Sequence, residues 1–138
     1  LREHNAIVRE QVVTHEGFEV KSEGDGFMLA FQSARRALQC AADIQRAFVQ
    51  RNESTDQPIR VRIGLHTGEA IKEADDFYGK AVILAARIAG QAQGGEILVS
   101  SLLKELTESA SDIAFGEGRE VELKGLSGRH RVFPVGWQ

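Results

Sequence analysis

Asp25 is the first of several charged residues whose position in this sequence suggests chemistry. It lies between two glycines in the segment Lys21-Ser22-Glu23-Gly24-Asp25-Gly26. Asp-Gly is typical of tight turns, because glycine adopts positive φ at little cost and aspartate tolerates the left-handed region. The segment therefore predicts a β-hairpin with a carboxylate at its tip. Local sequence alone favours a simple turn role for Asp25, whereas the nearby Lys21 and a second acidic cluster downstream favour a functional one.

Arg87 is the only charged residue between Ala81 and Ala89, in a predicted helix whose other side chains are Ala, Val, Ile and Leu. Such a helix is expected to be buried or to lie in an interface. A guanidinium group in that setting must reach solvent along its aliphatic stem or pair with an anion, because an unpaired buried charge is very costly. A solvent-reaching arginine, an internal salt bridge and a phosphate ligand all fit this pattern.

Three further residues are candidates for a structural or a functional role. Asp76 follows Asp75 at the entry to the same helix, where carboxylates either interact favourably with the helix dipole or contact a ligand. Lys124 ends the segment Val121-Glu122-Leu123-Lys124 before a glycine-containing loop, where it is either solvated or able to reach a phosphate. His66 ends a predicted strand, and no second histidine lies at the spacing of a zinc site, so we expect it to have a structural role.

The predicted elements that position these residues alternate between helices and strands. The order is a helix over residues 1–15 that ends at Glu16-Gly17, the hairpin, and then a helix with Ser33 as its N-cap. This order predicts an α+β fold with helices packed on a mainly antiparallel sheet. The remaining predicted elements are a solvent loop over 52–58, a half-buried strand over 59–66, a turn or short hairpin, a helix over 80–91, a strand over 96–100, a small helix capped by Ser100 or Ser101, and strands over 113–115, 119–123 and 129–135.

Composition limits the possible partners and the cellular setting. The 138 residues have a formal net charge of −3 and scattered basic residues, which predicts neither nucleic-acid binding nor direct contact with an anionic membrane. The single cysteine, Cys40, lies on the apolar face of a predicted helix, where we expect a buried, inert thiol. A reducing, cytoplasmic location follows as the default. No apolar run reaches the roughly 20 residues that span a bilayer, although fusion to regulatory or membrane domains remains open.

Together these segments resemble the catalytic domain of class III nucleotidyl cyclases of the bacterial adenylate cyclase type, over about residues 1–135. The glycine-flanked hairpin is similar to the family's metal-binding hairpin. The resemblance implies a ferredoxin-like or palm-type α+β sandwich, with residues 1–138 forming a single catalytic domain. The other matching segments are Arg62-Ile63-Gly64-Leu65-His66-Thr67-Gly68, Asp76-Phe77-Tyr78-Gly79 through Ala86-Arg87-Ile88, Gly95-Glu96-Ile97-Leu98-Val99-Ser100 and Leu123-Lys124-Gly125.

The same resemblance implies a role for each candidate residue. Asp25 would be one of two aspartates that bind Mg²⁺ or Mn²⁺, while Lys21 and Asp76 would contact the adenine edge of ATP. Arg87 would stabilise the transition state, and Lys124 would contact the terminal phosphates. The family's sites are shared across a homodimer, so both protomers would contribute residues to each site.

Two departures from the family pattern concern catalysis. The second metal-binding aspartate of the family lies on a strand upstream of residue 1, so this first strand is expected outside the 138 residues. Ile83 stands where the family usually has an asparagine that contacts the ribose. An adenylate cyclase domain and a weakly active or inactive cyclase-like dimerisation module are both compatible with this pattern. Gly94-Gly95-Glu96 resembles a diguanylate cyclase turn, but these glycines follow a helix, which disfavours that activity.

Overall fold

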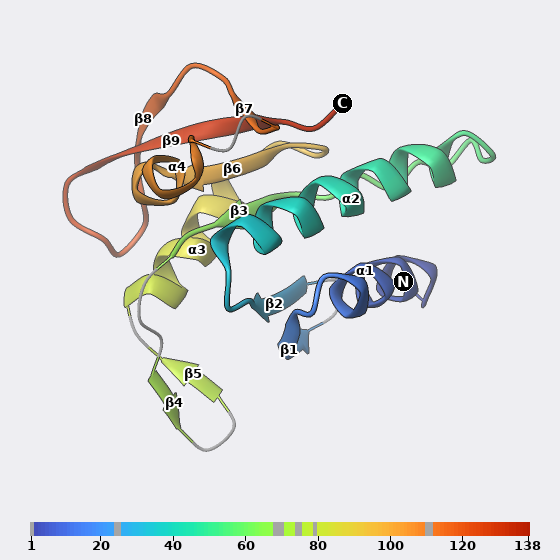
Figure 1. Cartoon of the computed structure of the whole chain (residues 1–138), viewed down its shortest axis with the longest axis horizontal. Helices are drawn as coiled ribbons and strands as arrows, with labels where there is room; N and C mark the ends of the chain where they lie inside the picture. The colour runs from blue at the N-terminus through green and yellow to red at the C-terminus, as the bar shows by residue number, and fades with distance from the viewer. Residues whose placement is uncertain (1, 24–25, 68–70, 74–75, 79, 110–111) are drawn as a thin grey trace. The chain divides into compact units, whose positions relative to one another are not determined.

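The computed structural model describes residues 2–23, 26–67, 71–73, 76–78, 80–109 and 112–138. The chain forms two compact units (Figure 1), one made by Leu1–Arg60 with Gln138 and the other by Val61–Trp137. The first unit contains α1 (Arg2–Thr14), β1 (Phe18–Glu23), β2 (Gly26–Ala30) and α2 (Ala34–Asn52). The second contains β3 (Ile63–Leu65), β4 (Ile71–Glu73), β5 (Asp76–Tyr78), α3 (Lys80–Gln91), β6 (Ile97–Ser100), α4 (Ser101–Thr107), β7 (Ala114–Phe115), β8 (Arg119–Glu122) and β9 (Arg129–Gly136).

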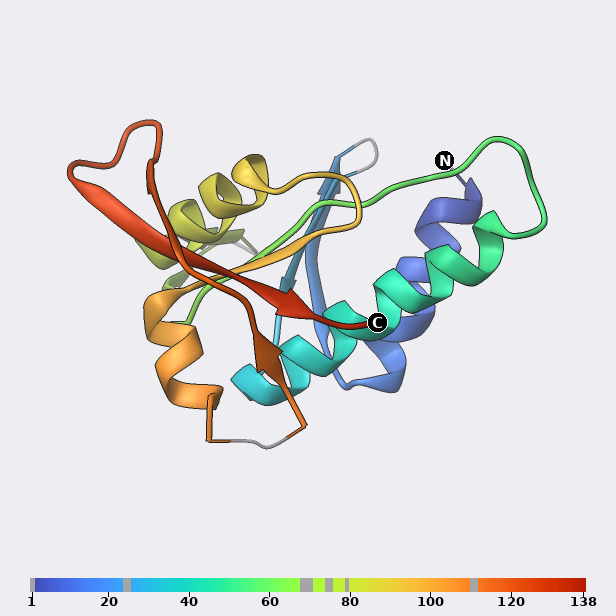
Figure 2. The ribbon, with the colours of Figure 1, turned by 90° about the horizontal axis from the view of Figure 1, so that it is seen from above.

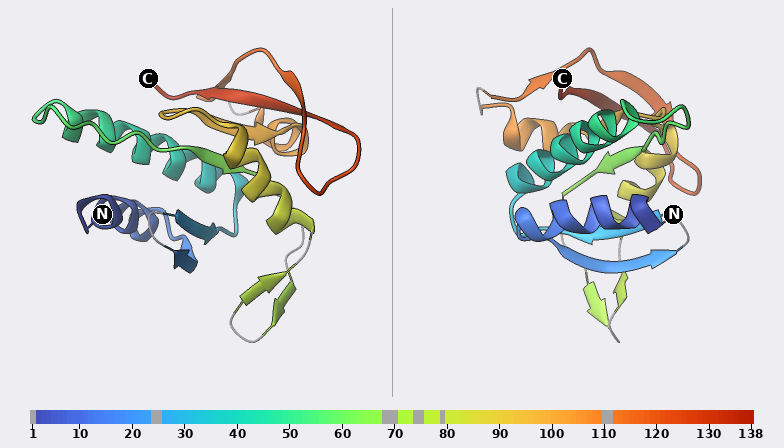
Figure 3. Two further views of the ribbon diagram at one scale, coloured as in Figure 1. Left: turned by 180° about the vertical axis from the view of Figure 1, so that it is seen from behind. Right: turned by 90° about the vertical axis from the view of Figure 1, so that its right-hand side faces the viewer.

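In the first unit, α1 packs against α2 and beside β1 (Figure 3). Both helices bury an apolar stripe, with Val8 and Val12 on α1 and Leu38, Ile44 and Phe48 on α2, among others. Cys40 is also buried. Its burial, and to a smaller extent the nearby Asp43 carboxylate, raise the pKa of its thiol to about 12. The predicted burial of Cys40 is therefore confirmed, and a raised thiol pKa agrees with the expected low reactivity.

The end of α1 is a Schellman motif. The Gly17 N–H donates to the Val12 carbonyl (2.8 Å) and the Glu16 N–H donates to the Val13 carbonyl (3.2 Å). Glu16, with φ of +57°, takes the left-handed position that glycine usually occupies in this motif. The predicted helix end at Glu16-Gly17 is therefore confirmed.

The predicted hairpin is also confirmed. β1 and β2 pair antiparallel from Phe18 opposite Ala30 to Glu23 opposite Gly26, with a register irregularity between Glu19 and Lys21. The predicted N-cap of α2 is present too, because the Ser33 hydroxyl accepts a hydrogen bond from the Arg36 N–H at 3.2 Å.

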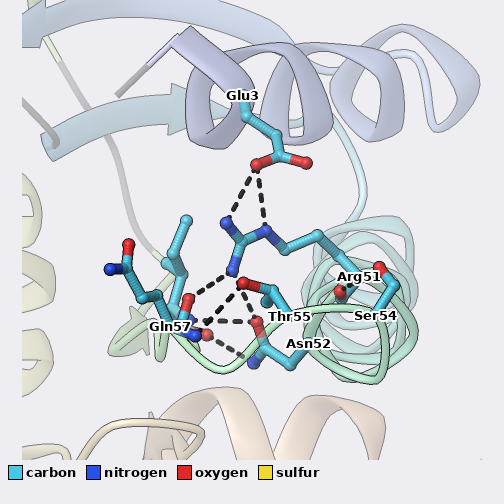
Figure 4. A network of polar contacts seen from close by, with 7 residues as sticks. Glu3, Arg51, Asn52, Ser54, Thr55 and Gln57 are labelled. Carbon is cyan, nitrogen blue, oxygen red and sulfur yellow. Dashed lines mark hydrogen bonds and ion pairs between the residues drawn. The ribbon is translucent and has the colours of Figure 1, made fainter.

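The segment after α2 is an exposed loop, as predicted, but the strand that follows it is shorter than predicted. Arg51 donates to the Glu3 carboxylate (3.0 Å from Nε) and to the Gln57 carbonyl (2.8 Å), as Figure 4 shows. The Asn52 side chain bonds both backbone groups of Ile59, accepting from its N–H at 3.0 Å and donating to its carbonyl at 2.8 Å. The predicted strand over 59–66 is therefore wrong in length, since these side chains replace the strand partners of Ile59 and β3 spans only Ile63–Leu65.

The second unit is organised around a five-stranded mixed sheet with the order β3-β6-β9-β7, in which β8 also pairs with β9. β3 and β6 are parallel, and the other pairs are antiparallel. β9 runs alongside β6 (Figure 2), and its other edge pairs with β8 and β7. The predicted mainly antiparallel α+β arrangement is confirmed, and β4 and β5 form the short hairpin expected before α3.

Helix α3 lies unusually close to β3. A Cβ atom built on Gly64 would be 2.2 Å from the Ala89 nitrogen and 2.8 Å from the Ala85 carbonyl oxygen. Only glycine allows this approach between the two backbones. Ile88 of α3 and Ala92, directly after the helix, form a buried cluster with Leu98, Leu123 and Val132. This cluster ties α3, β6, β9 and the end of β8 into one core.

Candidate active site

Arg87 and Lys124 are the two candidate residues that the structure brings together. The Nε–H of Arg87 donates a hydrogen bond to the backbone carbonyl of Lys124, at 2.9 Å. Arg87 lies on α3 and Lys124 in the turn after β8, so the bond joins elements that are distant in sequence. Both residues are exposed. Two cationic side chains therefore reach solvent from neighbouring positions in the structure.

The exposure of Arg87 decides among the sequence-based alternatives for its environment. Its guanidinium reaches solvent, while the adjacent Ile88 is 1% exposed and belongs to the core. The expectation that α3 is buried or lies in an interface is only half fulfilled within a single chain, because one side of the helix remains uncovered. Ile83, one turn before Arg87, is 47% exposed on that side.

Asp76 is the first residue of β5, opposite Glu73 of β4, and β5 directly precedes α3. The β4–β5 hairpin therefore places Asp76 close in sequence to the helix that carries Arg87. Its side chain lies outside the described part of the structure, so its contact with a base stays a prediction.

Lys21 and Asp25 belong to the first unit. Lys21 is paired with Met28 in the hairpin, directly after the register irregularity in β1. Its side chain, and the whole of Asp25, lie outside the described residues. The hairpin pairing on both sides of Asp25 is present, but the predicted metal and base contacts of these two residues stay predictions.

His66 has a partner that the sequence did not predict. Its Nδ1 atom is 2.7 Å from the Ser100 hydroxyl, which also accepts a hydrogen bond from the Leu103 N–H and so caps α4. Burial lowers the pKa of His66, which favours the neutral imidazole. The signal that could have revealed the His66–Ser100 contact is the parallel pairing of β3 with β6. Leu65 lies opposite Val99, and His66 and Ser100 directly follow these two residues in the sequence. The predicted structural role of His66 agrees with this geometry.

Oxygen ligands of the kind that Mg²⁺ and Mn²⁺ prefer are available on the candidate residues. Within the described ranges, no group of three or more His, Cys, Asp or Glu side chains is arranged to hold a metal ion. The carboxylate of Asp25 fits a hard divalent cation by its chemistry.

In the part of the chain that the structure describes, no helix is long and apolar enough to cross a membrane.

Helices packed on a mixed sheet place the molecule in the α+β class, and similar solved structures narrow this class to nucleotidyl cyclase domains. A structure described as an adenylate/guanylate cyclase/hydrolase from Silicibacter pomeroyi has a TM-score of 0.84 and 32% identity, covering 93% of this chain and 77% of that one. An adenylate cyclase from Trypanosoma brucei, described in its monomeric state, also has a TM-score of 0.84, with 25% identity, and covers 97% of this chain and 76% of that one.

The chain belongs to the adenylate and guanylate cyclase catalytic domain family, whose model matches residues 1–135. An adenylate cyclase of Mycosarcoma maydis is 37% identical over 88% of this chain, and putative adenylate cyclase 3 of Rhizobium meliloti is 32% identical over 87%. The chain spans only 6% and 21% of the length of these two relatives. The predicted family and fold class are confirmed, and the relatives support a cyclase.

Proposed function

We propose that this chain is the catalytic domain of an adenylate cyclase that converts ATP to 3′,5′-cyclic AMP and pyrophosphate, with its active site shared across a homodimer. The observation that carries the proposal is the hydrogen bond from Arg87 to the Lys124 carbonyl. It joins the Arg87 guanidinium to the backbone of Lys124, and the family pattern assigns these two residues to the transition state and to the terminal phosphates. The adenylate cyclase names of the relatives favour ATP as the substrate.

In the proposed reaction, the ribose 3′-hydroxyl attacks the α-phosphorus, the hydroxyl proton is lost, and the bond from the α-phosphorus to the pyrophosphate oxygen breaks. Negative charge grows on the phosphate oxygens as this bond breaks. Positioned cations and N–H donors stabilise such charge most strongly when they need no rearrangement. Arg87 suits this task because its Nε–H is held by the Lys124 carbonyl while the terminal nitrogens of its guanidinium carry further donors.

Lys124 and Asp25 complete the proposed phosphate and metal contacts. The ammonium group of Lys124 would act as a point charge on the terminal phosphates. Asp25, with the upstream aspartate expected from the family pattern, would hold Mg²⁺ or Mn²⁺. The metal would lower the pKa of the 3′-hydroxyl and offset phosphate charge. Lys21 and Asp76 would contact the adenine edge from the protomer that also supplies Arg87.

A weakly active or inactive dimerisation module is the second candidate function, and Ile83 favours it. The family pattern has an asparagine here, whereas this isoleucine is 47% exposed on the same side of α3 as Arg87. An apolar side chain cannot hydrogen-bond a ribose. The two functions thus differ in one measurable property, the rate of cyclic nucleotide formation.

The deciding experiment is cyclic nucleotide production by the full-length protein with Mn²⁺ and either ATP or GTP. We expect cyclic AMP from ATP, and an Arg87→Ala variant should lose on the order of 10²-fold in kcat. Absence of cyclic nucleotide from a folded, dimeric protein would favour the module. A product formed mainly from GTP would contradict the adenylate assignment, and unchanged turnover in Arg87→Ala would remove the proposed role of Arg87.

A further inference from the structure

The turn that carries Lys124 depends on a glycine with positive φ. The Leu126 N–H donates to the Leu123 carbonyl at 3.0 Å, which closes a β-turn over Leu123–Leu126. Gly125, in the third position, has a φ of +79°. Lys124, in the second position, is not among the residues with positive φ. Positive φ at the third position, without positive φ at the second, is the pattern of a type II turn.

The turn type decides where the Lys124 carbonyl points. This carbonyl belongs to the central peptide of the turn, between Lys124 and Gly125. Between type I and type II turns the ψ angle of the second residue changes from about −30° to about +120°, and φ of the third residue changes sign. These changes turn the central peptide over. The acceptor of the Arg87 hydrogen bond therefore exists in its observed direction only in the type II form.

Both sides of this hydrogen bond are fixed by one core. Leu123, the first residue of the turn, is 3% exposed, and Leu126 packs against the buried cluster that contains Ile88. Ile88 directly follows Arg87 on α3. Because the ends of the turn and the helix are anchored together, the direction of the central peptide and the side-chain torsions of Arg87 decide whether this hydrogen bond forms.

We propose that Gly125 is a positioning residue that holds the Arg87 guanidinium through the Lys124 carbonyl. This inference rests on the proposed function, in which Arg87 acts on the reacting phosphate. With Nε bonded to a fixed carbonyl, the plane of the guanidinium is set and its terminal nitrogens keep one direction. Replacing Gly125 by an L-residue disfavours the left-handed conformation and so favours the flipped peptide.

The chain offers a matched control for this substitution. A Cβ atom at Gly125 would meet no atom within 4 Å, and the same is true of Gly128, whose φ is +83°. Alanine at either position therefore introduces backbone strain without a steric clash. The carbonyl before Gly128 belongs to Ser127. Its oxygen lies 3.2 Å from the His130 Nε2 atom and has no described bond to Arg87.

The kinetic test compares Gly125→Ala, Gly128→Ala and Gly125→Asn in the full-length protein. Gly125→Ala should lower kcat by roughly tenfold with little change in KM, because misplacing a group that acts in the transition state affects kcat. Gly128→Ala should keep wild-type kcat. Gly125→Asn should recover most of the loss, since asparagine tolerates positive φ better than alanine. Equal kcat in the two alanine variants would overturn the inference.

A double-mutant cycle separates this inference from the proposed function. If Gly125 acts through Arg87, Gly125→Ala should cause no further loss in kcat when Arg87 is already alanine. An additional tenfold loss in that background would overturn the inference and leave the role of Arg87 intact. Full activity in the Arg87→Ala single variant would instead overturn the proposed role of Arg87.

A spectroscopic measurement tests the hydrogen bond without turnover. In ¹⁵N-arginine-labelled protein, the Nε–H proton of Arg87 should exchange slowly with water in the wild type and in Gly128→Ala. Its exchange should become at least about tenfold faster in Gly125→Ala, since the acceptor carbonyl turns away. An unchanged Arg87 exchange rate in Gly125→Ala would overturn the inference whatever the kinetics show.

Discussion

His66 is a half-buried histidine whose surroundings favour the neutral ring. Burial lowers the pKa of His66 in the folded protein, whereas an imidazole in the unfolded chain has a pKa of about 6.5. Below that pH the unfolded chain takes up a proton that the folded protein resists, so stability falls as the pH falls. At higher pH both states hold the neutral ring, and the effect disappears.

The first prediction follows from this difference. His66→Asn keeps a polar group near the Ser100 hydroxyl but cannot be protonated in this range. The loss of unfolding free energy between pH 7.5 and pH 5 should therefore be smaller in His66→Asn than in the wild type. Urea denaturation at a series of pH values measures this difference. Parallel stability curves for the two proteins would contradict the proposed linkage.

Lys21 and Asp76 carry the second prediction, which concerns the choice of base. A lysine can donate to the N1 atom of adenine and an aspartate can accept from the exocyclic amine, whereas guanine presents the reverse pattern. The double variant Lys21→Glu, Asp76→Cys should reduce the ATP:GTP ratio of kcat/KM by roughly tenfold or more. An unchanged ratio, measured with both nucleotides and Mn²⁺, would show that neither residue contacts the base.

The third prediction concerns Ile83, whose side chain emerges one helical turn before Arg87. Asparagine at this position would add a hydrogen-bonding group near the proposed ribose site, and a positioned group of this kind can contribute on the order of 10²-fold to the rate. Ile83→Asn should therefore raise kcat at saturating ATP. Ile83→Leu is the matched control, because it changes shape without adding a polar group. An Ile83→Asn variant that dimerises normally yet is no faster would contradict this interpretation.

At the scale of elements, the contact between α3 and β3 depends on the absence of a side chain at Gly64. Gly64→Ala should lower the free energy of unfolding by about 3 kcal/mol, because the atoms that its Cβ would meet belong to the backbone of Ala85 and Ala89 and cannot move aside easily. Chemical denaturation measures the change.

Gly90 is the matched control for this fourth prediction. Gly90 lies on α3, the helix that Gly64 contacts, directly after Ala89. A Cβ atom at Gly90 would meet nothing within 4 Å. Gly90→Ala should leave stability unchanged or raise it by up to about 1 kcal/mol, because alanine is the better helix former. Similar denaturation midpoints for Gly64→Ala and Gly90→Ala would show that the close approach of the two backbones does not limit stability.

Local sequence predicted the elements whose determinants are themselves local. The Ser33 cap, the end of α1 and the hairpin pairing all depend on residues within a few positions of each other. The strand expected from Ile59 failed because its backbone groups bond to Asn52, which a strand pattern does not include. In the candidate site, the residue pattern singled out Arg87 and Lys124 and the resemblance gave their expected roles. Neither revealed the hydrogen bond between them, because that bond depends on a turn and a helix meeting through a shared core.

At the scale of the whole molecule, α3 leaves one side uncovered in the single chain, and Ile83, Ala86 and Arg87 are exposed there. The fifth prediction is that the full-length protein forms a homodimer through this helix. Ile83→Lys should weaken self-association at least about tenfold in sedimentation equilibrium, because a lysine ammonium is costly to bury. Leu102→Lys on α4 is the matched control, since Leu102 is 45% exposed and Ile83 is 47% exposed. A wild-type protein that stays monomeric at high micromolar concentration would contradict the shared site.

The pairing of β9 has a consequence for synthesis on the ribosome. β9 is the last strand of the second unit, and it pairs with β6, β7 and β8. These three strands are therefore synthesised before their common partner. The first unit, by contrast, pairs β1 with β2 across a short hairpin. Its strands can thus pair early, while the sheet beneath Arg87 and Lys124 stays incomplete until Arg129–Gly136 has left the ribosome. A chain released before Arg129 would expose unpaired strand edges to chaperones.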